Sequence, residues 1–241
     1  MRLDKLLSIT GTATRSEAKR AIRRGAVRIG QAVATRADTD VDPERDTVLY
    51  EGRPVVYRRY TYILLNKPEG VVSATDDPRE RTVLDLLPEE LRRLSLFPCG
   101  RLDKTTLGLV LLTDNGALAH SLLSPKHHVS KEYYFRCQAP MTEREAAMFR
   151  QGLTLEDGYV TKPADIRLLG DGTEGYITLV EGKYHQIKRM LQALDNKIVY
   201  LERIRFANLS LGEHAPERGE WRFLTEEEVS SLEALADTQD I

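Results

Sequence analysis

Gly100-Arg-Leu-Asp-Lys-Thr-Thr-Leu-Gly108 is a short polar turn between two apolar stretches of the chain. Residues 94–97 approach it with two leucines and a phenylalanine, and Leu109–Leu112 follow it as a run of the length of a buried strand. The turn carries one carboxylate, Asp103, between an arginine and a lysine. A carboxylate between two cations suits a nucleophile or a general base better than a proton donor. The alternative is an ordinary loop aspartate that accepts hydrogen bonds from backbone amides.

Segments with strand and helix patterns lie on both sides of this turn. An apolar run from Tyr62 ends in Asn66-Lys-Pro-Glu-Gly70, which is a turn sequence, and Thr142 with Glu145 has the spacing of a helix-capping pair. This mixture of segments predicts an α+β fold. We expect strands at 62–65, 107–113, 131–137 and 175–180, and helices at 117–123, 142–151, 185–194 and after Thr225.

The first 58 residues are predicted to form a smaller module. Leucines at positions 3, 6 and 7 have helical spacing, and Thr14 with Glu17 can begin a second helix that ends before Gly25. Short strands are expected near 27–30, 46–50 and 54–58. Because residues 58–60 then form a junction, we predict two domains, residues 1–58 and 59–241.

The distribution of charge is far from even, although the formal net charge is only -2. Residues 1–36 carry a balance of +7 and residues 213–241 a balance of -7. A local basic patch can bind a polyanion whatever the net charge of the chain. A solvated helix face is the simpler interpretation, but six bases against one acid over residues 15–28 favour nucleic acid. The six are Arg15, Lys19, Arg20, Arg23, Arg24 and Arg28.

The composition restricts the class of protein. The chain has 241 residues and 41% hydrophobic side chains, enough for one or two domains with real cores. The sequence contains no apolar run near the roughly 18 residues of a membrane span and no secretory h-region at its start, so we expect a cytoplasmic protein. Two cysteines cannot form a disulfide framework, and the histidines lack zinc-binding spacing, so we expect no metal.

Gly182–Met190 is a further candidate site. If it is helical, His185, Lys188 and Arg189 share one face and gather positive charge that can pair with a carboxylate or a phosphate. An ordinary surface helix is the alternative.

Four motifs of the chain, and their order along it, resemble those of the RsuA-type pseudouridine synthases, which isomerise uridine in ribosomal RNA. Residues 1–58 also resemble the αL RNA-binding module of small-subunit ribosomal protein four. The resemblance implies a mixed, mainly antiparallel sheet flanked by helices behind that module. The motifs are Asn66–Ser73, Gly100–Thr113, Lys131–Tyr133 and Gly182–Met190.

The resemblance implies a role for individual residues. Asp103 matches the catalytic carboxylate, and Lys188 matches the basic side chain that pairs with it. Tyr133 matches the aromatic residue that stacks on the target uracil and takes the proton from its carbon 5. Arg101 matches the residue that fills the gap left by the flipped nucleotide, while Tyr134 leaves open which ring stacks. The expected RNA-binding residues are Arg15, Lys19, Arg20, Arg23, Arg24, Arg28, Lys67, Arg101, His185, Gln186 and Arg189.

The implied reaction is an isomerisation without net redox change or hydrolysis, so it needs no cofactor and no metal. We expect a monomer whose partner is ribosomal RNA or a ribosomal assembly intermediate. The residues after Tyr184 resemble the small-subunit (16S) branch more than the large-subunit one. A large-subunit enzyme of the same chemistry and a non-catalytic RNA-binding assembly factor are the alternatives.

Overall fold

The computed structural model describes residues 1–212 and 215–237; residues 213–214 and 238–241, part of the acidic stretch noted above, lie outside the described residues. The chain divides into two compact units. The first comprises Met1–Thr61 and Leu87–Leu96, and the second comprises Tyr62–Leu86 and Phe97–Ile241. The domain boundary after residue 58 stays a prediction.

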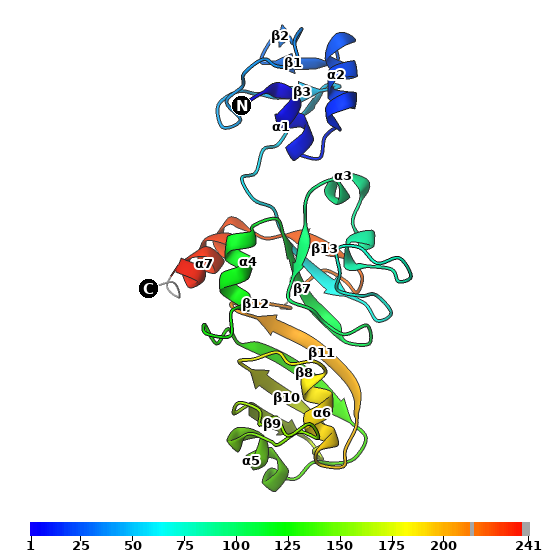
Figure 1. Cartoon of the computed structure of the whole chain (residues 1–241), viewed down its shortest axis with the longest axis vertical. Helices are drawn as coiled ribbons and strands as arrows, with labels where there is room; N and C mark the ends of the chain where they lie inside the picture. The colour runs from blue at the N-terminus through cyan, green and yellow to red at the C-terminus, as the bar shows by residue number, and fades with distance from the viewer. Residues whose placement is uncertain (213–214, 238–241) are drawn as a thin grey trace. The chain divides into compact units, whose positions relative to one another are not determined.

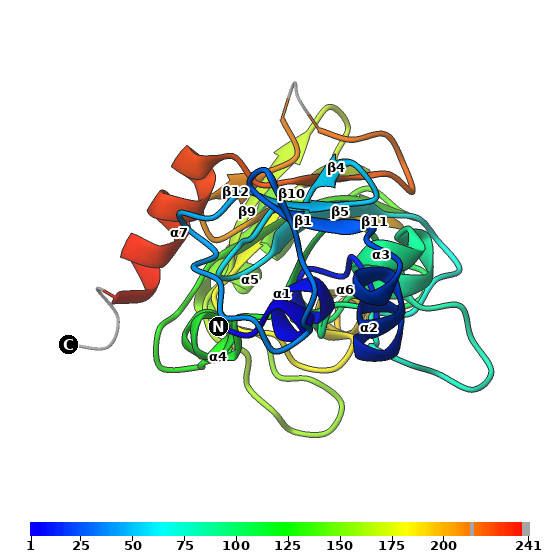
Figure 2. The same cartoon turned by 90° about the horizontal axis from the view of Figure 1, so that it is seen from above.

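The first unit packs two helices on a four-stranded sheet. Helices α1 (Leu3–Ile9) and α2 (Arg15–Arg23) lie side by side (Figure 2). The Thr14 hydroxyl accepts a hydrogen bond from the Glu17 amide while the Glu17 carboxylate accepts one from the Thr14 amide, which confirms the predicted start of α2. The sheet order is β2-β1-β3-β4, and the strands are β1 (Val27–Ile29), β2 (Ala32–Val33), β3 (Val48–Tyr50) and β4 (Arg53–Pro54).

Aliphatic side chains from both helices form the core of this unit. Leu3, Leu6 and Leu7 from α1 meet Ala18 and Ile22 from α2, and all five are buried. The expected strand at 54–58 was wrong in extent, because β4 ends at Pro54. Proline has no N–H to donate to a sheet ladder.

The second unit is built on a nine-stranded sheet of main order β13-β5-β7-β11-β8-β10-β9. Strands β7 and β11 run parallel and the other described pairs of this sheet are antiparallel, so the sheet is mixed and mainly antiparallel as expected. The strands are β5 (Tyr62–Lys67), β6 (Phe97–Cys99), β7 (Leu107–Thr113), β8 (Lys131–Cys137), β9 (Asp165–Leu169), β10 (Glu174–Leu179), β11 (Ile198–Phe206), β12 (Leu209–Ser210) and β13 (Trp221–Phe223).

Helices flank the sheet of this unit (Figure 1). Helices α4 and α7 lie beside each other near one end, while α5 and α6 lie near β9 and β11 at the other end. Capping pairs at Thr142 and Thr225, each with a glutamate three residues on, begin α5 and α7 as predicted. No helix in the described ranges is long and apolar enough to cross a membrane. The helical segments of this unit are η1 (Val83–Leu86), α4 (Gly116–Leu123), α5 (Glu143–Gln151), α6 (Gln186–Gln192) and α7 (Glu226–Asp237), while α3 (Glu89–Arg92) belongs to the first unit.

Gly108 marks the point where three strands of this sheet meet. It pairs with Lys67 of β5 on one side and with Arg203 of β11 on the other. Its φ is +101°, and a Cβ atom here would lie 2.3 Å from the Arg203 carbonyl oxygen. Glycine is therefore required at this crossing. The crossing places the turn between β6 and β7 next to the end of β5 and the middle of β11.

Candidate active site

The turn that carries Asp103 is held by its own backbone and by a neighbouring loop. The Thr106 amide donates to the Asp103 carbonyl at 3.0 Å, and the Leu102 amide donates to the Ser73 hydroxyl at 3.1 Å. The Gly70 amide donates to the Lys104 carbonyl at 2.9 Å. The Asp103 side chain keeps 25% of its surface exposed. A fixed turn thus presents a carboxylate that solvent or a ligand can reach.

Lys67 lies beneath this turn instead of on the surface. It is 0% exposed, and its ammonium group donates to the carbonyls of Pro68, Lys104 and Thr106 at 3.0, 3.3 and 2.8 Å. Burial is the main reason that the pKa of Lys67 is lowered to about 8. The ammonium group thus holds the backbone just after Asp103, and an RNA contact of Lys67 stays a prediction.

Lys188 on α6 forms an ion pair with Asp103. Its Nζ atom lies 2.7 Å from Asp103 Oδ2 and 2.9 Å from the Thr105 hydroxyl, and its side chain is 28% exposed. His185 Nε2 lies 3.5 Å from the other carboxylate oxygen, Oδ1. One oxygen is therefore fixed by an ammonium group and the other lies beside an imidazole.

His185 precedes α6 and is not part of it. The helix expected at 185–194 was too long at both ends: His185 adopts a left-handed conformation with φ 49°, and the helix runs from Gln186 to Gln192. This turn directs the imidazole toward Asp103. The Tyr184 ring stacks on the imidazole with centroids 3.8 Å apart.

Gln186 fixes the start of α6. Its amide nitrogen donates to the Glu181 carboxylate, and its carbonyl oxygen accepts a hydrogen bond from the Lys183 amide at 2.9 Å. Gln186 is buried but lines the pocket of Asp103, and an RNA contact of Gln186 stays a prediction. It is a positioning residue for the helix that carries Lys188.

Arg189 does not join the group around Asp103. Its guanidinium pairs with the Asp157 carboxylate at 2.5 Å. The expected cluster of three bases thus reduces to His185 and Lys188 at the carboxylate. An RNA contact of Arg189 stays a prediction.

Tyr133 and Tyr134 lie on opposite faces of β8, as neighbours in a strand do. Tyr133 is buried and lines the same pocket of about 80 Å³ as Asp103 and Lys188, with apolar walls from Leu179 and Ile187. Tyr134 instead contacts the rings of Tyr176 and Tyr200, and its hydroxyl donates to Glu174. The structure therefore favours Tyr133 as the ring next to the carboxylate.

Arg101 lines this pocket as well, and its side chain is exposed. It lies two residues before Asp103, on the same turn, so a molecule that enters the pocket passes close to it. Its predicted role in filling the gap left by a flipped nucleotide is not tested by this geometry and stays a prediction.

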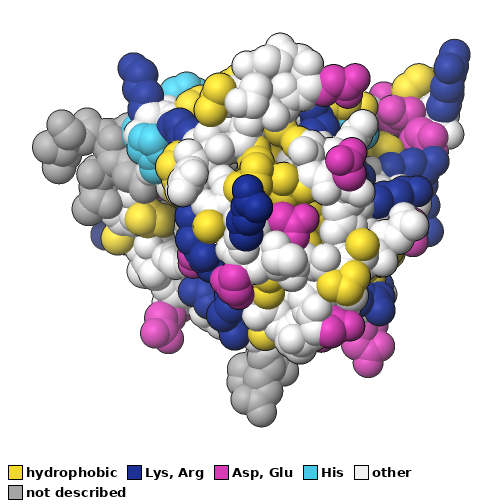
Figure 3. Space-filling model, turned by 90° about the horizontal axis from the view of Figure 1, so that it is seen from below, with side chains coloured by type: hydrophobic (Ala, Val, Ile, Leu, Met, Phe, Trp, Pro, Cys, Tyr) yellow, Lys and Arg dark blue, Asp and Glu magenta, His cyan; other side chains and the backbone are white. Residues whose placement is uncertain are grey.

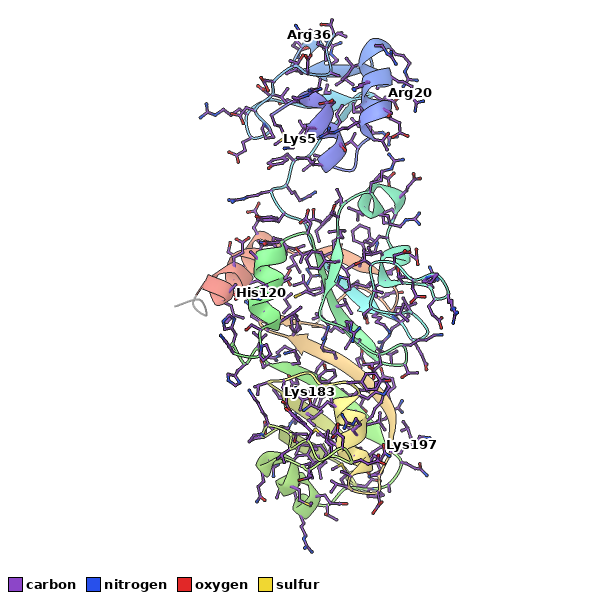
Figure 4. All side chains as sticks on the ribbon, viewed as in Figure 1. Lys5, Arg20, Arg36, His120, Lys183 and Lys197 are labelled. Atoms are coloured by element: carbon purple, nitrogen blue, oxygen red, sulfur yellow. The ribbon has the colours of Figure 1, made fainter. Side chains whose placement is uncertain are left out.

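The basic residues of the first unit are all at its surface. Arg24 pairs with Glu51 at 3.1 Å, and the Arg28 guanidinium donates to the Gln31 carbonyl. Figure 4 labels Arg20 on α2 and Arg36 after β2, on different sides of the unit. The six residues predicted from the sequence are exposed: Arg15, Lys19, Arg20, Arg23, Arg24 and Arg28.

Two residues of the site were missed in the sequence. Thr105 accepts a hydrogen bond from Lys188, and Glu181 accepts hydrogen bonds from Gln186, from the Tyr159 hydroxyl and from the Lys162 amide. Thr105 lies within the same motif as Asp103, and this position could have identified it as a site residue. Glu181 lies directly before the glycine of the last motif, but its partners come from distant parts of the chain.

Among the residues that the structure describes, no group of three or more His, Cys, Asp or Glu side chains could hold an ion. Cys99 is buried, and burial raises the pKa of its thiol to about 12, as expected for a structural thiol. The site consists of the Asp103 carboxylate, the side chains of Lys188 and His185, and the Tyr133 ring around a small pocket.

Comparisons with known proteins agree with this geometry. Residues 61–193 match the family model for RNA pseudouridylate synthases, and residues 1–48 match that for S4 domains. The chain is 46% identical to an uncharacterized RNA pseudouridine synthase of Bacillus subtilis, over 96% of this chain and 98% of that protein. It is 39% identical to ribosomal small subunit pseudouridine synthase A of Escherichia coli, over 96% of this chain and 100% of that protein.

A solved structure supports the same assignment. The chain aligns with a crystal structure of a pseudouridylate synthase at a TM-score of 0.67 and 37% identity, over 96% of this chain and 99% of that one. The fold and the site define an RNA-modifying isomerase that follows an RNA-binding module in the chain. The chain belongs to the RNA pseudouridylate synthase family, and its resemblance to the RsuA-type enzymes is confirmed.

Proposed function

We propose that this protein converts a uridine of small-subunit (16S) ribosomal RNA into pseudouridine, with Asp103 as the catalytic carboxylate. The observation that carries the proposal is the Asp103–Lys188 pair, at 2.7 Å, in the pocket that Tyr133 lines. The names of the relatives from Escherichia coli and from Vibrio cholerae, which are 39% and 38% identical to this chain, support the small subunit as the substrate.

The reaction exchanges one bond of the uridine for another. The bond between C1′ and N1 breaks, the uracil turns, a bond forms between C1′ and C5, and the C5 proton is lost while N1 gains one. Bond cleavage builds positive charge on the ribose, which a neighbouring carboxylate can stabilise, trap or relieve by removing a sugar proton. Asp103 is presented for each of these steps.

The other residues of the pocket support the carboxylate and the base. Lys188 holds one oxygen of Asp103 and balances its charge in a partly enclosed site. Tyr133 stacks on the uracil, which contributes about 1–3 kcal/mol, and accepts the C5 proton. Arg101, exposed beside the pocket, takes the place of the uridine in the RNA stack.

Binding of the RNA backbone offsets the cost of flipping the uridine out of its stack, a few kcal/mol. The exposed lysine and arginine side chains of α2 and β1 are suited to this role, because each phosphate that they neutralise releases condensed counterions. We propose further that the protein acts as a cytoplasmic monomer on ribosomal RNA or on an assembly intermediate, without a cofactor. Light scattering of the free protein tests the monomer, and a mass of twice 27.3 kDa would contradict it.

The test of the function is tritium release from carbon 5 of uridine in small-subunit and large-subunit RNA transcripts. We expect release from the small-subunit RNA, and a loss of at least about 10³-fold in Asp103→Asn with RNA affinity within about threefold of the original. Release from large-subunit RNA alone would move the substrate to that subunit. Full turnover by Asp103→Asn would remove the proposed role of the carboxylate.

A further inference from the structure

A second cavity, of about 260 Å³, adjoins the pocket of Asp103. The two share Arg101, Tyr133, Glu181, Gly182 and Lys183 as lining residues. Figure 4 labels Lys183 beside α6 and the neighbouring strands of the sheet. A ligand that places a base against Tyr133 in the first pocket therefore has a second space directly beside it.

The charge in this cavity is strongly one-sided. On the face that Figure 3 shows, lysine and arginine side chains are interspersed with acidic ones. The cavity instead has five cationic side chains and one carboxylate, Glu181, which already accepts the hydrogen bonds described above. The five are Arg101, Lys131, Lys162, Lys183 and Arg203.

Arg203 is the deepest of these cations, at 1% exposed. Its Nε donates to the Leu109 carbonyl at 2.8 Å, and its guanidinium lies over the Phe206 ring at 5.0 Å. Its Nη2 is buried and has no hydrogen-bond partner in the described structure. An unsatisfied donor on a buried cation is costly, so such a group favours a ligand that accepts hydrogen bonds.

Lys131 adds a second poorly compensated charge next to Arg203. Its Nζ donates to the Val129 carbonyl at 2.7 Å, so its protein partner is a neutral oxygen and not a carboxylate. Burial, and then the charge of Arg203, lower the pKa of Lys131 to about 8. The nearby thiol of Cys99 is neutral, because its own pKa is raised to about 12.

We propose that this cavity binds a phosphate group of the RNA strand next to the flipped uridine, through Lys131 and Arg203. Phosphate oxygens accept hydrogen bonds from a guanidinium and an ammonium group together, and their charge compensates both. The nucleotide in the first pocket carries such groups on both sides of its ribose. The inference rests on the proposed function, since it assigns the cavity to the same RNA strand.

The direct test follows Lys131 itself in the full-length protein. Nuclear magnetic resonance of chains with ¹³C at lysine Cε gives its pKa, and Lys131→Met identifies the signal. Inorganic phosphate should raise that pKa by about 1–3 units relative to chloride of equal ionic strength. Saturating small-subunit RNA should raise it as well, and phosphate added on top should then have no further effect. A pKa that neither ligand moves, or that phosphate moves and RNA does not, overturns the proposal.

The functional arm compares variants that lose the same charge. Lys131→Met should weaken RNA binding about tenfold. It should also lower the slope of log K against log salt by about the amount that corresponds to one released counterion. Lys183→Met, at the exposed rim, should act in the same direction with a smaller effect and provides a second test should Lys131→Met not fold. Arg144→Gln, on the exposed side of α5 and outside both cavities, is the control. Equal binding by all three variants counts against the subsite.

The two proposals fail differently. If phosphate and RNA raise the pKa of Lys131 while no tritium is released from small-subunit RNA, the subsite stands and the proposed function falls. If tritium is released normally by Lys131→Met and the pKa does not respond, the function stands and the subsite falls.

Discussion

Replacement of Lys188 by methionine tests the ion pair at the centre of the site. The change removes the ammonium group that lies 2.7 Å from Asp103 and keeps a side chain of similar length. His185 remains 3.5 Å from the other oxygen of the carboxylate, so Asp103 does not lose every neighbouring donor. We expect the rate of isomerisation to fall and RNA binding to change little, because Lys188 acts on the carboxylate that faces the ribose.

The size of the effect follows from the exposure of the two side chains, 28% and 25%. Exposed pairs contribute about 0–1 kcal/mol, whereas breaking a fully buried pair costs about 3–5 kcal/mol. This pair lies between these limits, so we take about 2–3 kcal/mol. At about 1.4 kcal/mol for each factor of ten, kcat should fall about 30- to 140-fold.

The assay is tritium release under saturating RNA, with KM measured in parallel. KM should stay within about threefold of the original, and Lys188→Arg should recover most of the rate because it restores the cation. Arg144→Gln, which removes a charge outside the pocket, should leave both constants unchanged. A Lys188→Met enzyme with kcat within threefold of the original would refute the reasoning.

Three further predictions follow from other parts of the molecule. Substitution of Arg15, Lys19, Arg23 and Arg24 together by glutamine should weaken RNA binding and reduce its salt slope by up to about 3, since each phosphate contact contributes about 0.7 on single strands; an unchanged slope in filter binding would dismiss this face. Gly108→Ala should lower the free energy of unfolding by at least about 3 kcal/mol in urea, because the new Cβ would meet the Arg203 carbonyl oxygen at 2.3 Å. Gly158→Ala, with a similar positive φ and no atom within 4 Å, should cost about 1–2 kcal/mol and is the matched control. Burial lowers the pKa of Lys67 from 10.5 to about 8, so between these pH values the unfolded chain binds the extra proton and the folded state gains about 3 kcal/mol as pH rises. In urea unfolding from pH 7 to 10.5, stability should rise by about 3 kcal/mol more in the original protein than in Lys67→Met, because Lys131, whose pKa is also lowered to about 8, contributes equally to both curves. Parallel curves would contradict this expectation.

Much of the fold could be predicted from local patterns. Strands β7 and β8 have the expected bounds, and the capping pairs at Thr14, Thr142 and Thr225 begin helices where they were expected. These features depend on neighbours within a few residues, so a single sequence contains them. Strand β11 was not predicted, because charged residues such as Glu202, Arg203 and Arg205 hide its apolar alternation.

The sequence alone determined the chemical identity of this protein's site: the turn around Asp103, the Lys-x-Tyr strand and the last motif carry the resemblance in their order and spacing. Only the tertiary structure decided which of the basic residues act on the carboxylate. Lys188 reaches Asp103 across 85 positions of the chain, whereas Arg189, one residue later, pairs with Asp157. Lys67 and Arg203 look like surface cations in the sequence. In the sheet, however, both stand opposite Gly108 on neighbouring strands, and their side chains are buried. The reason is that burial and ion pairing depend on which strands lie side by side, and that is a property of long-range contacts.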